Sequence, residues 1–142
     1  KGGKIRVSDK SKERFKEKVK QICQRNRGVK FGQIIKELNT VIRGWSAYFH
    51  KANSWISNLA HIDGWIRRKL RCYQLKQCGR KYTIYKMLRK LGGEEQESWN
   101  AVMYSQGWWA MSLKPVVSKS MNIEWFEKQG LRSVYTEMTR KR

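Results

Sequence analysis

The sequence predicts an all-α fold, in which a three-helix bundle is followed by a small helical appendage. Apolar residues recur at helical spacing in three long stretches, and short loops join those stretches. Hydrophobic residues make up 39% of the chain and include seven tryptophans, so a packed core is available and disorder is not expected. A length of 142 residues fits one domain, or one domain with a small appendage.

The first helix is expected to begin after residues 1–7, which form a linker or the last strand of an upstream domain. Ser8 or Asp9 can cap its N-terminus, and Gly28 is a plausible stop beyond its C-terminus. One face of this helix is apolar and another is basic. The apolar face consists of Phe15, Val19, Ile22 and Cys23, and the basic face of Lys12, Lys16 and Lys20.

The second helix is predicted from Phe31 to Phe49. Its buried side should consist of Ile34, Ile35, Leu38, Ile42, Trp45 and Phe49. Gly44 lies inside this helix, where glycine costs about 1 kcal/mol relative to alanine. Either another backbone approaches closely at Gly44, or the glycine is simply tolerated there.

The third helix is predicted from about Trp55 to Gln77, with Asn53 or Ser54 as its N-terminal cap. Its apolar seam consists of Trp55, Leu59, Ile62, Ile66, Leu70 and Tyr73. We expect four residues of the second and third helices to hold the bundle together and to be mostly buried. They are Trp45, Phe49, Trp65 and Leu70.

A short fourth helix should follow, with Ile84, Leu88 and Leu91 facing inward. Gly92-Gly93 then breaks the chain, so we divide it into a domain at 8–91 and a small helical region at 92–142.

Within the second region, Glu94, Glu95 and Glu97 favour a helix N-terminus because they oppose the positive end of the helix dipole. Trp99, Val102 and Met103 should give that helix its apolar face. Gly107-Trp108-Trp109 and Pro115 mark loops. A last helix should start at Ser118 or Ser120, carry Ile123 and Phe126, and end at Gly130.

The positive charge is concentrated in the first two thirds of the chain. Of a formal net charge of +21, residues 1–40 carry 13 basic and 4 acidic groups, and residues 41–93 carry 12 and 1. Residues 94–142 carry 7 basic and 6 acidic groups and are almost neutral. Localised positive charge on a folded domain is typical of nucleic-acid binding, and a basic surface without a specific partner is the alternative.

The third helix and the segment after it carry the densest charge. Between Gly64 and Leu91 there are ten lysines or arginines and no acid. Arg67 and Arg71 share a helical face, and we expect both to point away from the bundle. Like charges this close repel one another unless an anion neutralises them. The alternative is a solvated face whose long side-chain stems cover Trp and Leu.

The candidate nucleic-acid-binding residues are therefore Lys12, Lys16, Lys20, Arg67, Arg68, Lys69, Arg71, Lys76, Arg80, Lys81, Lys86, Arg89 and Lys90. Lys and Arg neutralise phosphates, and aromatic rings beside them can stack on unpaired bases. Tyr73, Tyr82 and Tyr85 are candidates for such stacking. Composition alone does not separate RNA from DNA.

Groups for metal or nucleophilic catalysis are sparse. Metal-dependent nucleotidyl transfer needs clustered carboxylates, and the only two aspartates, Asp9 and Asp63, are far apart in the sequence. Cys23, Cys72 and Cys78 are odd in number and lack CxxC spacing, which indicates reduced thiols and no structural zinc. We expect no enzymatic activity, cofactor or metal in this chain alone. With no apolar run near twenty residues, we expect no membrane partner.

Three sets of residues form recognisable motifs. The main set is Leu38-Asn39, Arg43-Gly44-Trp45, Tyr48-Phe49, Asp63, Trp65 to Arg71, and Lys76-Gln77. An earlier set is Ile5 to Ser8 with Lys10-Ser11 and Phe15-Lys16, and a later one is Gly107, Trp109, Ser112, and Glu124-Trp125 to Gly130-Leu131. Together they resemble the group II intron reverse transcriptases. In order, they correspond to the maturase-specific region, the junction from palm to thumb, and the carboxyl-terminal DNA-binding region.

The resemblance implies that 8–91 is a thumb (X) domain that grips intron RNA during splicing and template–primer during reverse transcription. It implies that 92–142 contacts target DNA during retrohoming of the mobile element, although its near-neutral charge favours a docking role on the thumb. The parent protein is expected to be an RNA-directed DNA polymerase, with magnesium and the catalytic aspartates in an upstream palm. A reducing bacterial cytoplasm or an organelle would suit it. The upstream reverse transcriptase domains are then a further partner.

Two hypotheses from other classes remain open at this point. One is a stand-alone helical DNA-binding module, as in a recombinase. The other is a protein-interaction domain whose basic face meets an acidic partner. Binding to structured intron RNA, duplex DNA and a polyanionic protein would separate the three.

Overall fold

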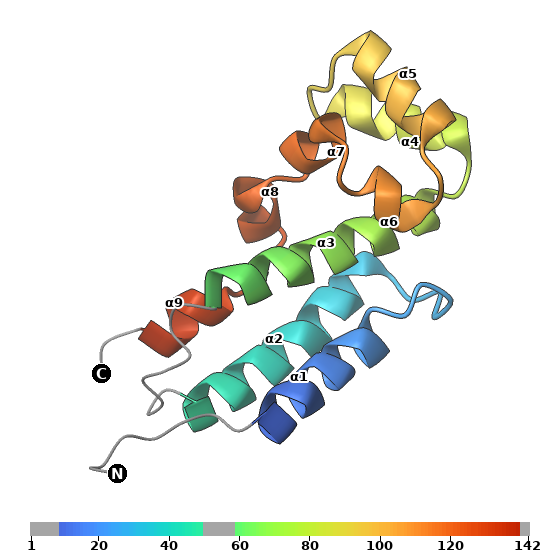
Figure 1. Ribbon diagram of the computed structural model, residues 1–142. Helices are drawn as coiled ribbons and strands as arrows, with labels where there is room; N and C mark the ends of the chain where they lie inside the picture. The colour runs from blue at the N-terminus through green and yellow to red at the C-terminus, as the bar shows by residue number, and fades with distance from the viewer. Residues whose placement is uncertain (1–8, 50–58, 140–142) are drawn as a thin grey trace.

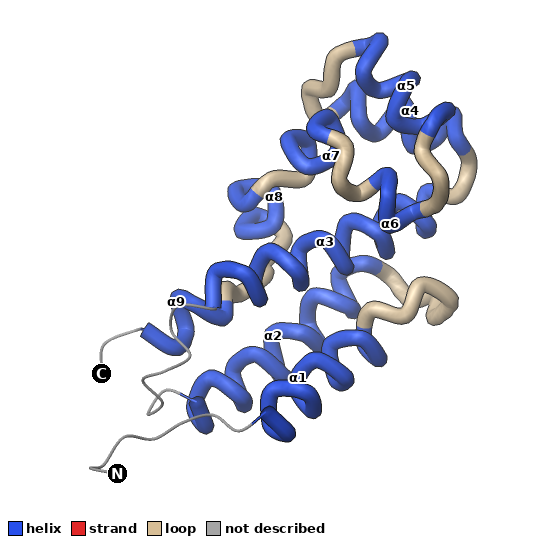
Figure 2. The backbone as a smooth tube through the Cα atoms, viewed as in Figure 1, coloured by secondary structure: helices blue, strands red, loops and turns tan. Residues whose placement is uncertain are grey.

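The computed structural model describes residues 9–49 and 59–139. That part of the chain consists of helices and loops and contains no strand, which confirms the predicted all-α class (Figures 1 and 2). The three long helices are α1 (Asp9–Ile22), α2 (Phe31–Phe49) and α3 (Leu59–Cys78). The bounds of α2 coincide with the prediction. The expected cap at Asn53 or Ser54 and the start at Trp55 lie outside the described residues, as do residues 1–7.

The core of the bundle forms where the predicted apolar faces meet. Its fully buried residues include Phe15 and Val19 of α1, Ile34 and Leu38 of α2, and Leu70 of α3. Each comes from a position with helical spacing, so burial follows directly from the sequence pattern.

The two tryptophans predicted to be mostly buried lie at the margin of this core. Trp45 and Trp65 are each half-buried and pack against the core from outside. The Trp45 ring meets Phe15 edge-on, with centroids 6.0 Å apart and planes at 65°. The side chain of Phe49 lies outside the described residues.

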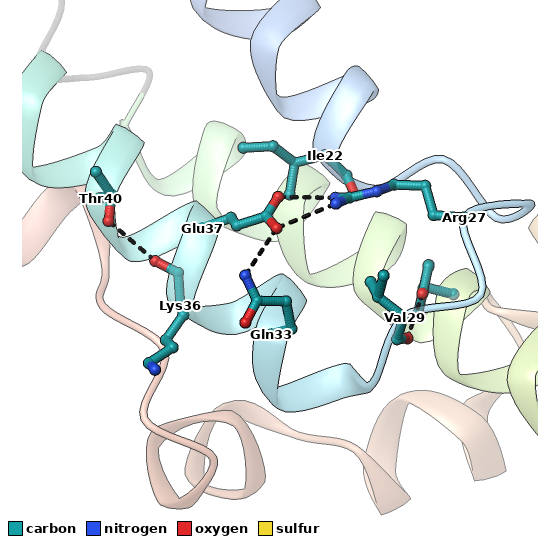
Figure 3. Close-up of polar contacts among 8 residues, drawn as sticks. Ile22, Arg27, Val29, Gln33, Lys36, Glu37 and Thr40 are labelled. Carbon is teal, nitrogen blue, oxygen red and sulfur yellow. Dashed lines mark hydrogen bonds and ion pairs between the residues drawn. The ribbon is translucent and has the colours of Figure 1, made fainter.

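Polar contacts to α2 and to α3 hold the loop between α1 and α2, and Figure 3 shows the contact between Arg27 and Glu37 of α2. Arg27 donates one hydrogen bond to the carbonyl of Ile22 and two to the carboxylate of Glu37, at 2.8 and 3.0 Å. Tyr73 and Gln77 of α3 both donate to the carbonyl of Val29. These contacts hold the loop in place at the end of α1.

The helices α4 (Lys81–Lys90) and α5 (Glu95–Tyr104) form a hairpin at the end of the molecule away from the start of α1 (Figure 1). As predicted, the acidic residues begin α5: Glu94 caps it by accepting a hydrogen bond from the backbone of Glu97 at 2.9 Å. Gly92 has a φ of 101°, a conformation that favours glycine. The expected break at Gly92-Gly93 is therefore a tight turn between α4 and α5.

The region after α5 differs from the prediction in four places. Two segments predicted as loops are short helices, α6 (Trp108–Met111) and α7 (Pro115–Ser120). Proline suits the first position of α7, because an N–H at that position would have no partner in the helix and proline has none. Asn122, rather than Ser118 or Ser120, caps α8 (Ile123–Lys128), and α9 (Val134–Thr139) was not predicted.

This region folds back along the bundle. Helix α6 packs against α3, and α9 packs against both α2 and α3 (Figure 1). Both ends of α3 are therefore contacted by helices from beyond Gly93. Among the described residues, no helix has the length and apolar character to cross a membrane.

Candidate nucleic-acid interface

The structure places twelve of the thirteen predicted basic residues on three surfaces, and Lys12 lies on none of them. One surface lies between α1 and α3, a second lies where α3 meets the C-terminal region, and the third covers α4. The surfaces differ in how exposed their side chains are and in which groups those side chains contact. That any of these side chains contacts nucleic acid stays a prediction.

An open groove of about 680 Å³ separates the C-terminal end of α1 from α3. Its basic residues come from three segments: Lys20 from α1, Arg25 from the following loop, and Lys69 and Lys76 from α3. Glu17 also lines the groove and forms an ion pair with Lys20, with Nζ and Oε2 3.5 Å apart. Four cations and one carboxylate give the groove a strongly positive lining.

Aromatic rings adjoin this groove. Trp108 is part of its lining. Lys69 places its Nζ 5.6 Å from the Trp65 ring and 5.4 Å from the Trp109 ring, and Lys16 places its Nζ 6.0 Å from the Trp65 ring. We call Lys16, Lys20, Lys69 and Lys76 with these rings the α1–α3 basic face. Alternating ammonium groups and indole rings can contact both phosphates and bases.

The arginines of α3 lie on the second surface, where they bind the C-terminal region. Arg68 donates to Oγ of Ser112 at 2.9 Å and to the carbonyl of Trp109 at 2.7 Å. Its guanidinium carbon lies 3.6 Å from the centroid of the Trp109 ring. Arg68 thus fastens α6 to α3.

The prediction that the side chain of Arg71 points away from the bundle into solvent is wrong. Arg71 is half-buried, donates from Nε to the carbonyl of Met121 at 2.9 Å, and lies 5.5 Å from the Phe126 ring. Burial, with a smaller effect from Arg67, lowers the pKa of Arg71 to about 10. Arg67 is also half-buried and lines a pocket of about 240 Å³ that includes Phe126 and Leu131.

The third surface is α4. Lys81, Lys86, Arg89 and Lys90 are all exposed there, and Arg80, also exposed, is the residue before the first turn. Arg89 donates to the carbonyl of Gly93 at 3.1 Å. Lys12 of α1, the remaining predicted residue, is half-buried and is not part of the α1–α3 groove lining.

Two polar residues of the main motif set have a role that the sequence did not indicate. Asp63 is buried and accepts hydrogen bonds from the backbone of Val134 and Tyr135, at 2.7 and 3.0 Å, and from Oγ of Ser133 at 2.7 Å. It therefore caps α9 from α3. Nothing local marks this role, because the partners are about 70 residues away.

Asn39 of α2 makes a similar contact with the loop that precedes α9. Its Nδ2 donates to the carbonyl of Gly130 at 2.7 Å, and its Oδ1 accepts from the backbone of Arg132 at 2.8 Å. Asn39 and Asp63 together hold the segment 130–135 against the bundle.

The cysteines form no disulfide, and the candidate stacking residues differ in their exposure. Cys23, Cys72 and Cys78 are free thiols, and burial raises the pKa of Cys23 to about 12. No group of three or more potential metal ligands occurs in the described ranges. Of the candidate stacking residues, Tyr73 is buried in the core and does not reach the surface, whereas Tyr82 is 60% exposed.

Fold and surface together define a class, the small all-helical domains with strongly basic surfaces. The family of the group II intron maturase-specific domain matches residues 12–92, which is more than half of the chain. The chain belongs to that family. The match includes α1 from Lys12 onward, α2, the described part of α3, and α4, and leaves out α5 to α9. No curated protein matches the chain.

Proposed function

We propose that this chain binds the RNA of a group II intron and promotes its splicing, with the α1–α3 basic face as the main contact. In the protein from which it comes, the same domain would act as the thumb that holds template–primer during reverse transcription. The observation that carries the proposal is the convergence of Lys20, Arg25, Lys69 and Lys76 on one groove beside tryptophan rings.

The chemistry of the groove suits a folded RNA. Lysine ammonium groups neutralise phosphates without a sequence code, and structured RNA is bound largely through its shape and backbone. Half-buried lysine stems that pack on indole rings lose less conformational freedom on binding than mobile surface lysines do. Lys16 and Lys69 fit this description.

The C-terminal region is proposed to act mainly by docking onto the thumb. Arg68 and Arg71 use their Nε–H groups for contacts inside the molecule, so they contribute positive potential more than direct phosphate contacts. Contact with target DNA during retrohoming is a further part of the proposal and rests on the family alone.

The test compares two double variants of equal net charge. Lys69→Glu with Lys76→Glu reverses two charges in the groove, and Lys36→Glu with Lys128→Glu reverses two exposed lysines elsewhere. Filter binding to a folded group II intron transcript should weaken by about tenfold or more in the first variant only, because phosphate contacts are replaced by repulsion. Duplex DNA and polyglutamate serve as competitors. Equal loss in both variants, or preference for polyglutamate, would overturn the proposal.

A further inference from the structure

Three aromatic rings form a cluster on the α4–α5 hairpin, apart from the α1–α3 basic face. Tyr85 of α4 and Trp99 of α5 stack with centroids 4.0 Å apart and planes at 14°. Tyr82 lies one turn before Tyr85, with its ring 6.1 Å from Tyr85 and 6.4 Å from Trp99. Its plane is within 28° of both, so all three rings have nearly the same orientation.

This cluster is open to solvent on the Tyr82 side. Tyr82 is 60% exposed, while Tyr85 and Trp99 are half-buried beside it. Met103, one helical turn after Trp99, is 48% exposed and extends the apolar surface. The ring of Tyr82 thus has rigid aromatic support but little protein cover, an arrangement that the core of the hairpin does not require.

The surroundings of Tyr82 are cationic. The Nζ of Lys86 lies 5.3 Å from the Tyr82 ring, and Lys81 directly precedes it in the chain. Helix α4 contains four basic residues and no acidic one. A protein partner with an apolar surface would have to desolvate these cations. A nucleotide satisfies both features, because its base offers an aromatic face and its phosphate offers a counter-charge.

We infer that Tyr82, supported by Tyr85 and Trp99, stacks an unpaired base of the bound RNA, while Lys86 and Lys81 contact the adjoining phosphates. The base must be unpaired, because a base inside a duplex has both faces covered by its neighbours. The inference rests on the proposed RNA-binding function and adds a base contact to its backbone contacts. The site is sequence-tolerant, since every base has a stacking face.

The experiment uses the 142-residue chain and two RNA probes. One is a hairpin with a single-stranded adenosine tail, and the other is the same hairpin with a blunt end. The variant Tyr82→Leu removes the ring and keeps an apolar side chain, and Tyr82→Phe restores the ring without the hydroxyl. The control is Tyr104→Leu, because Tyr104 is 76% exposed on the same hairpin but outside the ring cluster. An unchanged melting temperature shows that each variant is folded.

Wild type should bind the tailed hairpin more tightly than the blunt one. Tyr82→Leu should lose about 5- to 100-fold in affinity for the tailed probe, the range measured for one base stacked on an aromatic ring. Its affinity for the blunt probe should not change, and Tyr82→Phe and Tyr104→Leu should resemble wild type. Equal affinity of wild type for both probes, or an equal loss for both in Tyr82→Leu, would overturn the base-stacking site. Failure of the chain to bind either probe would instead count against the proposed RNA-binding function.

Discussion

Asp63 illustrates what a single buried carboxylate does in this fold. Its two oxygens accept three hydrogen bonds from the N-terminal end of α9 and the residue preceding it. Bonds from backbone N–H groups to an ionised carboxylate are stronger than those between neutral groups, and the helix dipole adds to them. Asp63, for which the sequence predicted no structural role, therefore caps a helix that lies far along the chain.

We predict that Asp63→Ala lowers the free energy of unfolding by about 1–3 kcal/mol, the usual cost of leaving buried donors unsatisfied. Hydrogen exchange of the amides of residues 134–139 should speed up most, because α9 loses its cap. His61→Ala, an exposed change on the same helix, is the control. Unchanged exchange in α9 would show that the cap contributes nothing.

The ion pair between Arg27 and Glu37 gives the protein a defined response to acid. Hydrogen bonds from Arg27 first, and from Gln33 second, lower the pKa of Glu37 from its ordinary 4.5 to about 2 (Figure 3). A lowered pKa in the folded state stabilises the fold at pH values above 4.5. That contribution is lost as the pH falls towards 2. The pair lies near the surface, so its contribution is on the order of 1 kcal/mol at most.

We predict that Glu37→Gln removes this contribution at neutral pH and has little effect in strong acid. Thermal unfolding of wild type and variant should therefore differ near neutral pH and converge as the pH approaches about 2, the pKa of Glu37. Comparing the two proteins cancels the protonation of the other carboxylates. Glu127→Gln, which changes an exposed glutamate on α8, should show no such convergence. A constant difference across the pH range would contradict this role of the ion pair.

At the scale of helices, the turn between α4 and α5 depends on close approach at one glycine. A Cβ atom on Gly93 would lie 2.8 Å from Oγ of Ser98, 2.8 Å from Cγ2 of Val116 and 2.9 Å from the carbonyl of Leu88. Two of these neighbours are a buried side chain and a backbone atom, which have little room to move. Gly44 differs, because no described atom lies within 4 Å of a Cβ placed there. Of the two explanations left open for Gly44, simple tolerance fits the described residues.

We predict opposite effects of the same substitution at these two glycines. Gly93→Ala should destabilise the protein by about 1–3 kcal/mol through overpacking. Gly44→Ala should stabilise it by up to about 1 kcal/mol, because alanine favours the interior of a helix. Chemical denaturation of both variants measures the two changes. Equal effects at both positions would contradict the packing described for the α4–α5 turn.

The elements differ in how far the sequence could predict them. Helices α1 to α4 carry several turns of apolar residues at helical spacing, and α5 begins at an acidic cap, so local signals suffice. Helices α6 and α7 span only 4 and 6 residues, which is too short for a periodic pattern. Helix α9 begins where a carboxylate on α3 caps it, and that partner is remote in sequence. Only the tertiary structure supplies this information.

At the scale of the whole molecule, α3 is the element that joins the bundle to the C-terminal region. One side of it borders the α1–α3 groove, and other positions bind α6, α9 and the carbonyl of Met121. The run Arg67 to Arg71 showed that the helix is basic. It did not show which charges face outward, because the partners of Arg68 and Arg71 lie 41 to 50 residues further on. The sequence therefore indicated the charge of the site but not its division into surfaces.

The contacts of Arg71 change the effect on stability that we expect from replacing it. If its side chain pointed outward, Arg71→Glu would leave the fold intact or stabilise it slightly. Because Arg71 is half-buried and donates to Met121, we predict a loss of about 2–3 kcal/mol, since the variant places a carboxylate beside a carbonyl oxygen. Thermal melting of Arg71→Glu against Lys76→Glu, an exposed change on the same helix, measures the difference. A melting temperature equal to that of wild type would contradict the docking of the C-terminal region through Arg71.

If the α1–α3 basic face binds RNA through phosphates, the affinity for RNA must fall steeply as the salt concentration rises. Four phosphate contacts, from Lys16, Lys20, Lys69 and Lys76, predict a log–log slope of affinity against salt of about −3 to −4. Lys69→Glu with Lys76→Glu should flatten that slope by about 2, and Lys36→Glu with Lys128→Glu should leave it within about 0.5 of wild type. Binding of a folded intron transcript across a salt series gives all three slopes. A groove variant that is folded and binds with the wild-type slope would contradict RNA binding by the α1–α3 basic face.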